Sequence, residues 1–537
     1  MPTLEWRNRR EALRAAAAAP VRVLHEVSEL SVGPSDSPNL LIHGDNLDAL
    51  KALLPFSAGQ VKCIYIDPPY NTGSAFEHYD DHLEHSTWLS LMYPRLELLR
   101  QFLSEDGSIW ISLDDEEAHY CRVICDEVFG RGNFIADVAW EKSDSPRMDA
   151  KLFSTRYDHT LVYAKNIGEV QIRRVLVEEV PKHYNKQTPD GRRYYLKPLR
   201  AMGKNDGRAD RPNLYYSLTA PDGSDVYPIR ADGSDGNWRW SRTKVEENPQ
   251  LIEWVHGRKG WTPYYRIFSD EHSSRPPETL WSFSFAGSNR NAMAEQTSLF
   301  GTVNAFDTPK PERLIQRILE IATDEGDLVL DSFLGSGTTA AVAHKMERRW
   351  IGVEMGDHAR THCAVRLQKV VSGEQGGISK AVKWDGGGGF HFLELGEVLR
   401  DETGAVRTEI SWDALAAHLW WSETKTGFWS ARSASRKGQI RDDAVAIPSP
   451  VLGIHDGVAY ALLFNGILKD RRVNGGNVLT RATLELVKRD LARLHSGETP
   501  EKLVVFAEWS RLGQATLEAE KIEFRPTVAT LEGAPCN

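Results

Sequence analysis

Strands and helices alternate along this chain in two blocks, and the alternation predicts an α/β fold built on a doubly wound, mostly parallel sheet. In the first block, apolar runs at 39–45 and 61–67 are each followed by a segment with helical periodicity. The second block repeats the pattern from 328 onwards. A long polar, aromatic-rich stretch separates the blocks, so we expect one sheet that carries an inserted domain.

Each element of the two blocks has its own local signal. The strands are short apolar runs, and the helices show apolar residues at three- and four-residue spacing. Ser86 and Thr87 are candidate N-caps, and Pro311 suits the first turn of a helix. The expected elements of the first block are strand 39–45, helix 47–54, strand 61–67, helix 86–103, strand 107–115, helix 116–129 and edge strands 134–140 and 159–166. Those of the second block are helix 310–327, strand 328–333, helix 335–346 and strand 348–355.

Composition shifts divide the chain further. Asp-Gly turns and tryptophans replace periodicity from Asn166 to about Ala305, and a stretch too long for a loop should be a domain. A Gly-rich run, Trp384 to Phe390, precedes a last region with strands 460–466 and 502–509 around helix 481–494. The predicted parts are an N-terminal helical arm 1–38, core 39–166, insert 167–305, core 306–383, linker 384–396 and a small C-terminal α/β domain 397–537.

The composition is that of a globular protein. The chain has 537 residues, a net charge of −10 and 41% apolar residues, with no apolar run of the roughly 18 residues that a membrane span needs. We therefore expect a cytoplasmic protein. Five scattered cysteines form no CxxC pair. Three histidines lie close together in an acidic segment, and we expect them to be solvated: His78, His82 and His85. The sequence thus predicts neither disulfides nor a metal site.

The first chemical motif is LVLDSFLGSGTT, Leu328 to Thr339. A buried strand that enters a helix through a Gly-rich turn lets backbone approach a ligand, and the helix N-terminus offers unpaired amide donors. Glu354 ends the next strand, about 20 residues past the turn, where a carboxylate can bind ribose hydroxyls. Only G-x-G is present, at Gly335 and Gly337, which favours a mononucleoside ligand. Taken alone, the motif is a weak signal, and an ordinary tight strand-to-helix turn is the alternative.

The second motif, Asp67-Pro68-Pro69-Tyr70, follows the strand VKCIYID. Two prolines fix two φ angles and remove two backbone donors, so the turn is stiff and presents its acceptors in fixed directions. Asp67 and the Pro68 carbonyl can accept hydrogen bonds from one exocyclic amine while Tyr70 stacks on a flipped base. On the tetrapeptide alone, a plain Pro-Pro turn is the alternative, and the Gly-rich turn in the same expected sheet argues against it.

Together these motifs resemble the amino-methyltransferases of DNA in their permuted β-type order. The segments NLLIHGDNLDAL, YIDPPYNTGSAF, TPKPERLIQRIL and WDGGGGFHFLELG resemble the modification (Mod) subunit of type III restriction-modification systems. The resemblance covers most of residues 39 to 396 and implies a Rossmann-like fold, S-adenosyl-L-methionine as cofactor and double-stranded DNA as substrate. Leu334 stands where such turns often have alanine.

The resemblance also assigns roles to positions of this chain. Asp45 would lie near the adenosine of the cofactor, Lys310 to Leu314 near its methionine end, and Glu354 on its ribose. The implied catalytic residues are Asp67, Pro68, Pro69 and Tyr70. The implied cofactor-binding residues are Asp45, Asp67, Lys310, Pro311, Leu314, Asp331, Phe333, Gly335, Ser336, Gly337, Thr338 and Glu354.

A basic segment inside the insert is the candidate DNA reader. Between Lys182 and Arg211, nine basic and three acidic residues give a local charge of +6, interleaved with tyrosines. Such a segment suits phosphate neutralisation and base contact, although a solvated basic face is the simpler alternative. The predicted DNA-binding residues are Arg192, Arg193, Tyr194, Lys197, Arg200, Lys204, Arg208 and Arg211.

Three functions compete. The first is transfer of a methyl group to N6 of adenine by base flipping; the second is transfer to N4 of cytosine, which presents the same amine geometry. Asp67 favours adenine by resemblance only. The third is a DNA-specificity subunit without activity, which would predict a damaged cofactor site. The resemblance further implies a homodimer and a restriction (helicase-nuclease) subunit. The restriction subunit is expected to be a separate polypeptide, because this chain carries no Gly-Lys-Ser/Thr phosphate loop.

Overall fold

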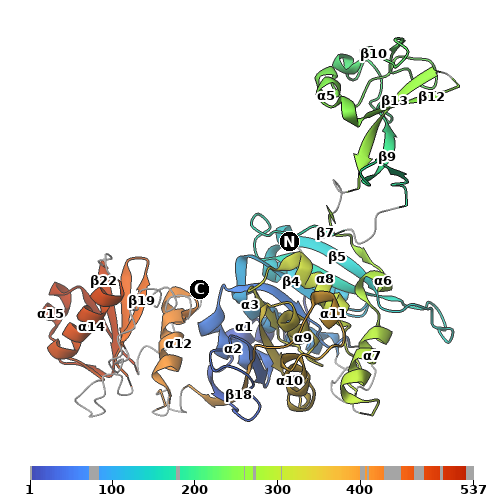
Figure 1. Cartoon of the computed structure of the whole chain (residues 1–537). Coiled ribbons are helices and arrows are strands. Elements are labelled where there is room, and N and C mark those ends of the chain that lie inside the picture. The colour runs from blue at the N-terminus through green and yellow to red at the C-terminus, as the bar shows by residue number, and fades with distance from the viewer. Residues whose placement is uncertain are drawn as a thin grey trace. The chain divides into compact units, whose positions relative to one another are not determined.

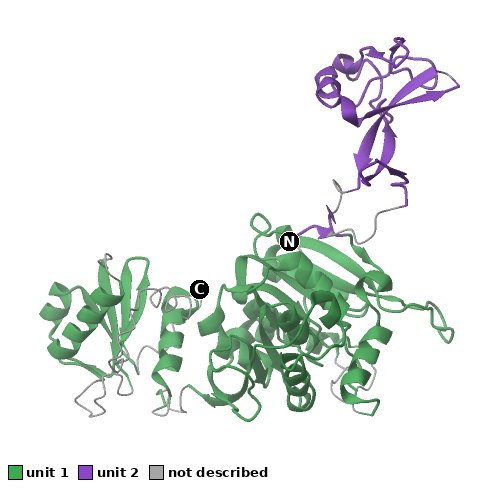
Figure 2. Cartoon of the chain, in the orientation of Figure 1, with its two compact units in different colours: residues 1–172, 278–537 green, residues 173–277 purple. Residues whose placement is uncertain are grey.

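The computed structural model describes residues 3–71, 84–176, 182–258, 260–269, 274–303, 305–399, 406–407, 410–428, 449–464, 477–495 and 500–527. Two compact units make up the chain (Figure 2): residues 1–172 with 278–537, and residues 173–277. His78, His82 and Cys536 lie outside the described residues, and the other four cysteines are free and buried. Within the described ranges, no group of three or more metal-binding side chains is arranged to hold an ion.

A large sheet forms the centre of the first unit. Most neighbouring strands are parallel, and the antiparallel pairs are β1 with β18, β4 with β6, and β6 with β5. The predicted doubly wound, mostly parallel sheet is therefore confirmed. Its strands in spatial order are β1 (Arg22–Glu26), β18 (His391–Val398), β2 (Leu40–His43), β17 (Arg349–Glu354), β16 (Leu328–Asp331), β3 (Val61–Ile66), β4 (Leu103–Leu113), β6 (Tyr157–Ala164), β5 (Phe134–Glu141) and β15 (Leu280–Trp281).

Helices connect these strands and cover the sheet (Figure 1). They are α2 (Asn46–Ser57), α3 (His85–Phe102), α4 (Ala118–Cys125), α8 (Glu312–Ala322), α9 (Thr338–Lys345) and α10 (Val365–Val371). Helix α3 links β3 to β4, whereas α9 links β16 to β17 on the other side of the strand order. The winding therefore reverses between β16 and β3. The strand residues Ile42, Ile64 and Leu330 are fully buried in the main core.

Two details of the predicted helices differ in the structure. Helix α3 begins at His85, after Glu84 as N-cap, and neither Ser86 nor Thr87 caps it. The segment predicted as one helix to residue 129 is α4 followed by a π-helical turn, Asp126–Gly130. Both differences are local, since helix ends are set by tertiary contacts as much as by capping residues.

The boundaries of three predicted parts also differ. The arm 1–38 contains helix α1 (Arg9–Ala18) but also β1, and the Gly-rich linker runs into β18, with which β1 pairs. The insert predicted as 167–305 is a compact unit of 173–277. Its predicted end lies too late because β15 pairs with β5 and so returns the chain to the large sheet.

The second unit is built on a small antiparallel sheet, β12-β13-β9-β8. These strands are β8 (Lys186–Gln187), β9 (Arg193–Pro198), β12 (Ile252–Gly257) and β13 (Gly260–Phe268). Leu199, Tyr216 and Trp238 form its core. The strands β7 (Val175–Leu176) and β14 (Ser274–Arg275), at the two ends of the unit, pair with each other.

The region after β18 contains a four-stranded sheet, β19-β20-β22-β24, as a small α/β arrangement. Separate apolar clusters lie around α12 (Trp412–Thr424) and around α14 (Arg481–Leu494). The strands are β19 (Val451–His455), β20 (Val458–Leu462), β22 (Lys502–Ala507) and β24 (Ile522–Pro526), and α15 (Gln514–Ala519) precedes β24. Across the described part of the chain, none of the helices combines the length and the apolar character that crossing a membrane requires.

Candidate functional site

The two motifs found in the sequence leave neighbouring strands at the same edge of the sheet. Strands β3 and β16 are parallel neighbours, with Cys63 beside Val329 and Ile64 beside Leu330. The Asp67 turn follows β3 and the Gly-rich turn follows β16, so two segments about 260 positions apart lie side by side. This edge is also the point where the winding reverses, which is where open α/β sheets bind ligands.

A buried tryptophan forms a hydrogen bond with the Asp-Pro-Pro-Tyr turn. The fully buried Trp88 of α3 donates its indole N–H to the carbonyl of Pro69 at 2.7 Å. Because the two prolines already fix their φ angles, this bond leaves the turn little freedom. The next residue, Asn71, is in the left-handed region with φ of 61°. The turn is therefore a stiff platform for Asp67 and Tyr70.

Lys310 brings a positive charge to this platform. Its ammonium forms an ion pair with Oδ2 of Asp67 and lies 4.8 Å from the centre of the Tyr70 ring. Oδ1 of Asp67 is buried and makes no hydrogen bond within the described residues. Burial, with the Asp67 charge, raises the pKa of Tyr70 well above 10, so its ring carries a neutral hydroxyl. The lysine thus shows that an amine donor fits between the Asp67 carboxylate and the Tyr70 ring.

The Gly-rich turn needs both of its glycines. Gly335 and Gly337 have φ of +55° and +80°, in the region that favours glycine. Gly337 is the N-cap of α9, and a Cβ at this position would lie 3.3 Å from Cα of Cys363. The hydroxyl of Thr338 donates to the carbonyl of Lys310 at 3.2 Å. The turn is therefore tied to the residue that contacts Asp67.

Two acidic residues lie buried at the ends of β16 and β17. Glu354 accepts the amide of Gly335 at 2.7 Å and lies 3.0 Å from His358. Burial opposes ionisation, yet the contacts from His358 and backbone amides outweigh it and lower the pKa of Glu354. Burial raises the pKa of Asp331 to about 7. The carboxylate of Glu354 is engaged by the protein itself, so its contact with ribose stays a prediction.

The other predicted cofactor residues divide into two groups. Asp45 is the N-cap of α2 and forms an ion pair with Arg95 at 3.0 Å. Its neighbour Asn46 donates to the carbonyl of Ser332 at 2.7 Å, which links the end of β2 to the Gly-rich segment. Several other side chains are buried in the packing of this edge, namely Leu314, Phe333, Ser336 and Thr338, and Pro311 is the N-cap of α8.

Sequence reasoning missed a buried carboxylate next to the Asp-Pro-Pro-Tyr turn. Glu117, whose side chain is fully buried, accepts hydrogen bonds from Asn71 at 2.7 Å and lies 2.7 Å from Nδ1 of His85. These two residues flank segment 72–83. Burial raises the pKa of Glu117, although its hydrogen bonds oppose the shift. Nothing local in the acidic run after β4 marks this residue, because its partners are 32 and 46 positions away.

A second missed feature is a buried ionic network beneath the Gly-rich turn. Glu312 of α8 forms ion pairs with Arg366 and Lys345, both at 2.8 Å. Arg366 also donates to the hydroxyl of Thr338 at 2.8 Å. The network therefore fixes α8, α9 and α10 against the turn.

A third missed residue lies on β6. Asp158 is buried and forms an ion pair with Lys142 at 2.6 Å. Burial raises its pKa, while the charges of Lys142 and Lys310 oppose the shift. Asp158 lies just before the predicted strand 159–166, and no local signal indicates that the charge of Lys310 acts on it.

The predicted DNA-binding residues all lie in the second unit. Tyr194 differs from the others, because its ring is buried and its hydroxyl donates to Glu253 at 2.9 Å. Arg208 pairs with Asp235 at 2.8 Å, and Arg200 lies 3.7 Å from Asp206. The exposed members are Arg192, Arg193, Lys204, Arg208 and Arg211, while Lys197 and Arg200 are half-buried. The exposed residues remain candidates for phosphate contact, and Tyr194 is part of the packing.

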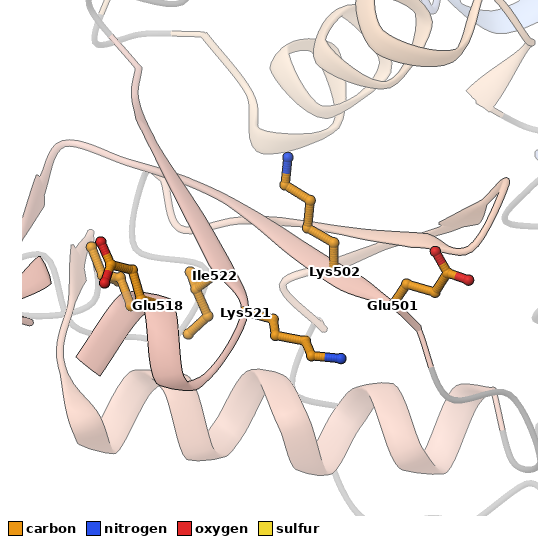
Figure 3. Close-up of a pocket in the computed structure, with 6 residues that line it drawn as sticks. Glu501, Lys502, Glu518, Lys521 and Ile522 are labelled. Atoms are coloured by element: carbon orange, nitrogen blue, oxygen red, sulfur yellow. The ribbon is translucent and has the colours of Figure 1, made fainter. Parts of the chain in front are cut away.

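A surface pocket of about 310 Å³ lies elsewhere, in the C-terminal region (Figure 3). Lys502 and Lys521 point away from each other there, and Glu501 and Glu518 stand on either side. Lys502 forms an ion pair with Glu523. The pocket has mixed charge and contains none of the candidate site residues.

The fold and the two turns define an α/β protein whose candidate ligand site lies at the switch point of its sheet. A family model described as DNA methylase matches residues 61–364, which includes both turns and the insert. The chain belongs to this DNA methylase family. The assignment confirms the resemblance found in the motifs.

Individual relatives agree with the family. The chain is 33% identical over 412 residues to a probable HindVI Mod subunit of Haemophilus influenzae, covering 66% of this chain and 54% of that protein. It is 32% identical over 364 residues to the EcoPI Mod subunit of Escherichia phage P1, covering 58% and 56%. With the type II methyltransferase M.KpnI of Klebsiella pneumoniae it shares 30% over 342 residues, covering 60% and 79%.

The chain spans about half the length of the type III Mod subunits it matches. Among solved structures it is similar to the cytosine-N4-specific PvuII DNA methyltransferase, with a TM-score of 0.34 and 17% identity, over 61% of this chain and 86% of that one.

Proposed function

We propose that the chain transfers a methyl group from S-adenosyl-L-methionine to the N6 amine of adenine in double-stranded DNA, after flipping the base. The observation that carries the proposal is the side-by-side arrangement of the Asp67 turn and the Gly-rich turn, with Lys310 between them. Membership in the DNA methylase family supports it, as does the similarity to Mod subunits.

The catalytic turn would hold the amine of the flipped base. Asp67 and the Pro68 carbonyl are acceptors, and Tyr70 offers a half-buried ring for stacking. The ammonium of Lys310 now takes the donor position on Asp67, so it must leave this carboxylate when a base enters. Holding both amine hydrogens directs the nitrogen lone pair away from the turn. Rate would come from positioning and exclusion of water, without a covalent intermediate.

The residues around the Gly-rich turn fit a nucleoside cofactor. The turn has two positive-φ glycines at a helix N-terminus, and the hydroxyl of Ser332 beside it is buried without a hydrogen bond among the described groups. Glu354 would hold the ribose by exchanging its backbone donors for hydroxyl donors. Lys310, once released from Asp67, would be available to pair with the carboxylate at the methionine end of the cofactor. The cofactor would supply an electrophilic methyl group.

The choice of adenine over cytosine depends on Asp67 and on the resemblance to type III Mod subunits. Both bases present an exocyclic amine, and the acceptors of the turn suit either one. Type III Mod subunits are among the curated proteins to which this chain is similar, one of them 33% identical over 412 residues. By the same resemblance, we propose a homodimer that works with a separate helicase-nuclease subunit.

The test is methylation of DNA in cells that express the chain, read by long-read sequencing and by mass analysis of nucleosides. We expect 6-methyladenine at one sequence in wild type, and none with Asp67→Ala. If 4-methylcytosine is the sole product, adenine is rejected as the target base in favour of cytosine. Calorimetry of the purified chain that shows no binding of S-adenosyl-L-methionine would instead support an inactive specificity subunit.

A further inference from the structure

The loop between β5 and β6 exposes an unusual set of apolar side chains. Met148, Leu152 and Phe153 are 94%, 92% and 95% exposed. Large apolar side chains that are grouped and almost fully exposed mark interaction sites in soluble proteins. In Figure 1 this loop projects from the end of the large sheet. Its three apolar side chains therefore call for a partner.

The loop leaves the sheet at the edge that carries the catalytic turn. Strand β3 ends beside β4, with Ile66 opposite Ile111, and β4 pairs with β6 so that Leu113 faces His159. Residue 157 opens β6 and pairs with Glu141, the last residue of β5. The loop thus begins and ends at the same edge of the sheet at which β3 ends and Asp67 follows.

Ion pairs fix the base of the loop, whereas the apolar side chains of its tip are exposed. At the base, Arg156 pairs with Glu141 and Lys142 pairs with Asp158, both at 2.6 Å. Asp144 is held from α7 (Asn289–Phe300) by Arg290 at 2.8 Å. Nearer the tip, the amide of Arg147 donates to the hydroxyl of Ser154 at 2.6 Å. A fixed base with an exposed tip suits a contact element that acts on a partner at the site.

The tip combines two features that DNA duplexes accept. Arg147 and Lys151 are exposed there and lie beside the three apolar residues. Basic side chains neutralise phosphates, and Phe, Leu and Met are the side chains that proteins insert between base steps when they distort a duplex. A duplex from which one base has been flipped into the catalytic turn offers such a gap next to this edge.

We infer that the tip of this loop, residues 147–153, contacts double-stranded DNA beside the target base and inserts Phe153, with Leu152 and Met148, into the stack. The inference rests on the proposed function and extends it to the element that stabilises the flipped state. The basic residues of the second unit would supply separate phosphate contacts.

Direct contact can be tested without relying on methyl transfer. The photo-crosslinking residue p-benzoylphenylalanine is placed at position 153 of the full chain and irradiated with a short duplex that carries the sequenced site, or with sheared duplex DNA if no site is found. The matched control carries it at position 509, because Trp509 is also exposed, at 70%, but lies in the C-terminal region. We expect a crosslink to DNA from position 153 and none from 509.

A kinetic arm uses the triple variant Met148→Ala, Leu152→Ala, Phe153→Ala, with Trp509→Ala as control. On a duplex with 2-aminopurine in place of the target adenine, we expect the triple variant to lose most of the fluorescence rise. On the unmodified duplex, whose target adenine carries the N6 amine, we expect it to lose about tenfold in kcat/KM. Binding of S-adenosyl-L-methionine should stay as in wild type, which shows that the variant is folded.

The outcomes separate the two proposals. A crosslink from position 153 without methylation by wild type would reject the proposed function but retain the DNA contact. Methylation by wild type, with no DNA crosslink and with a fully active triple variant, would reject the loop's role alone. A crosslink from position 153 to a second copy of the chain, unaffected by DNA, would also reject it, since the apolar tip would then be a dimer contact.

Discussion

The proposed chemistry depends on single residues at the switch point, above all on Asp67, which forms an ion pair with Lys310. We expect Asp67→Asn to lower kcat about a hundredfold or more, because the amide keeps one acceptor but turns an N–H toward the substrate amine. Rates at saturating cofactor and DNA measure the effect. An Asp67→Asn variant that retained most of its turnover would contradict the role assigned to this carboxylate.

Asp331 gives a prediction in pH. Burial raises its pKa from 3.8 to about 7, so between pH 4 and 7 the folded state keeps a proton that the unfolded state has released. Its contribution to the free energy of unfolding is therefore fully present below pH 4 and lost as the pH rises towards 7. Asp331→Asn should flatten this dependence by up to about 4 kcal/mol and still accept the amide of Phe333.

Urea unfolding of wild type and Asp331→Asn from pH 4 to pH 8 measures this difference. Comparing the two proteins cancels the effect of half-buried carboxyl groups such as Glu97 and Asp114, whose pKa values partial burial also raises. Parallel pH profiles for the two proteins would show that Asp331 does not titrate in this range.

At the scale of elements, the Gly-rich turn should tolerate no side chain. Gly337→Ala places a Cβ against Cys363 at a φ of +80°, next to the proposed cofactor site. Gly326→Ala is a matched control, since φ is +78° there and nothing lies within 4 Å of the added Cβ. Both variants should lose about 1 kcal/mol of stability from strain, but only Gly337→Ala should weaken cofactor binding in calorimetry. Equal affinities would disprove the assignment.

The network beneath the turn predicts coupling between helices. Arg366→Met leaves Lys345 as the ion-pair partner of Glu312 among the described residues, beside the amide of Ile378. It should cost about 3 kcal/mol, because a buried ion pair is broken from one side. Adding Glu312→Gln should cost less than the sum of the single changes, with a coupling of about 1 kcal/mol or more. A double-mutant cycle in chemical unfolding measures it, and strict additivity would mean that the two residues do not act together.

The strands, the main helices and the two turns were readable in the sequence because their signals are local. Apolar runs mark β3 and β16, and the chemistry of Asp67 and Gly337 stands in short motifs. The roles of Glu117 and Arg366 were not readable, since each depends on partners brought together by the fold. The predicted end of the insert, at residue 305, lies too late. The strand β15 is only two residues long, yet it returns the chain to the large sheet well before the helical pattern that begins at 310.

At the scale of the whole molecule, the chain carries its candidate DNA reader as a unit that can be removed. Strands β7 and β14 pair at the two ends of residues 173–277, so the chain enters and leaves this unit at neighbouring points. A short Gly-Ser linker in place of residues 177–273 should therefore close the gap without strain in the first unit.

This shortened chain should bind S-adenosyl-L-methionine as wild type does, because both turns and the ionic network belong to the first unit. Its affinity for DNA should fall, and its preference for the methylated site over other DNA should disappear with the basic residues of the insert. Calorimetry and binding to duplexes at several salt concentrations measure both effects. The salt dependence should flatten, since fewer phosphates are neutralised. Retained site preference would place sequence recognition in the first unit, and lost cofactor binding would show that the two units depend on each other to fold.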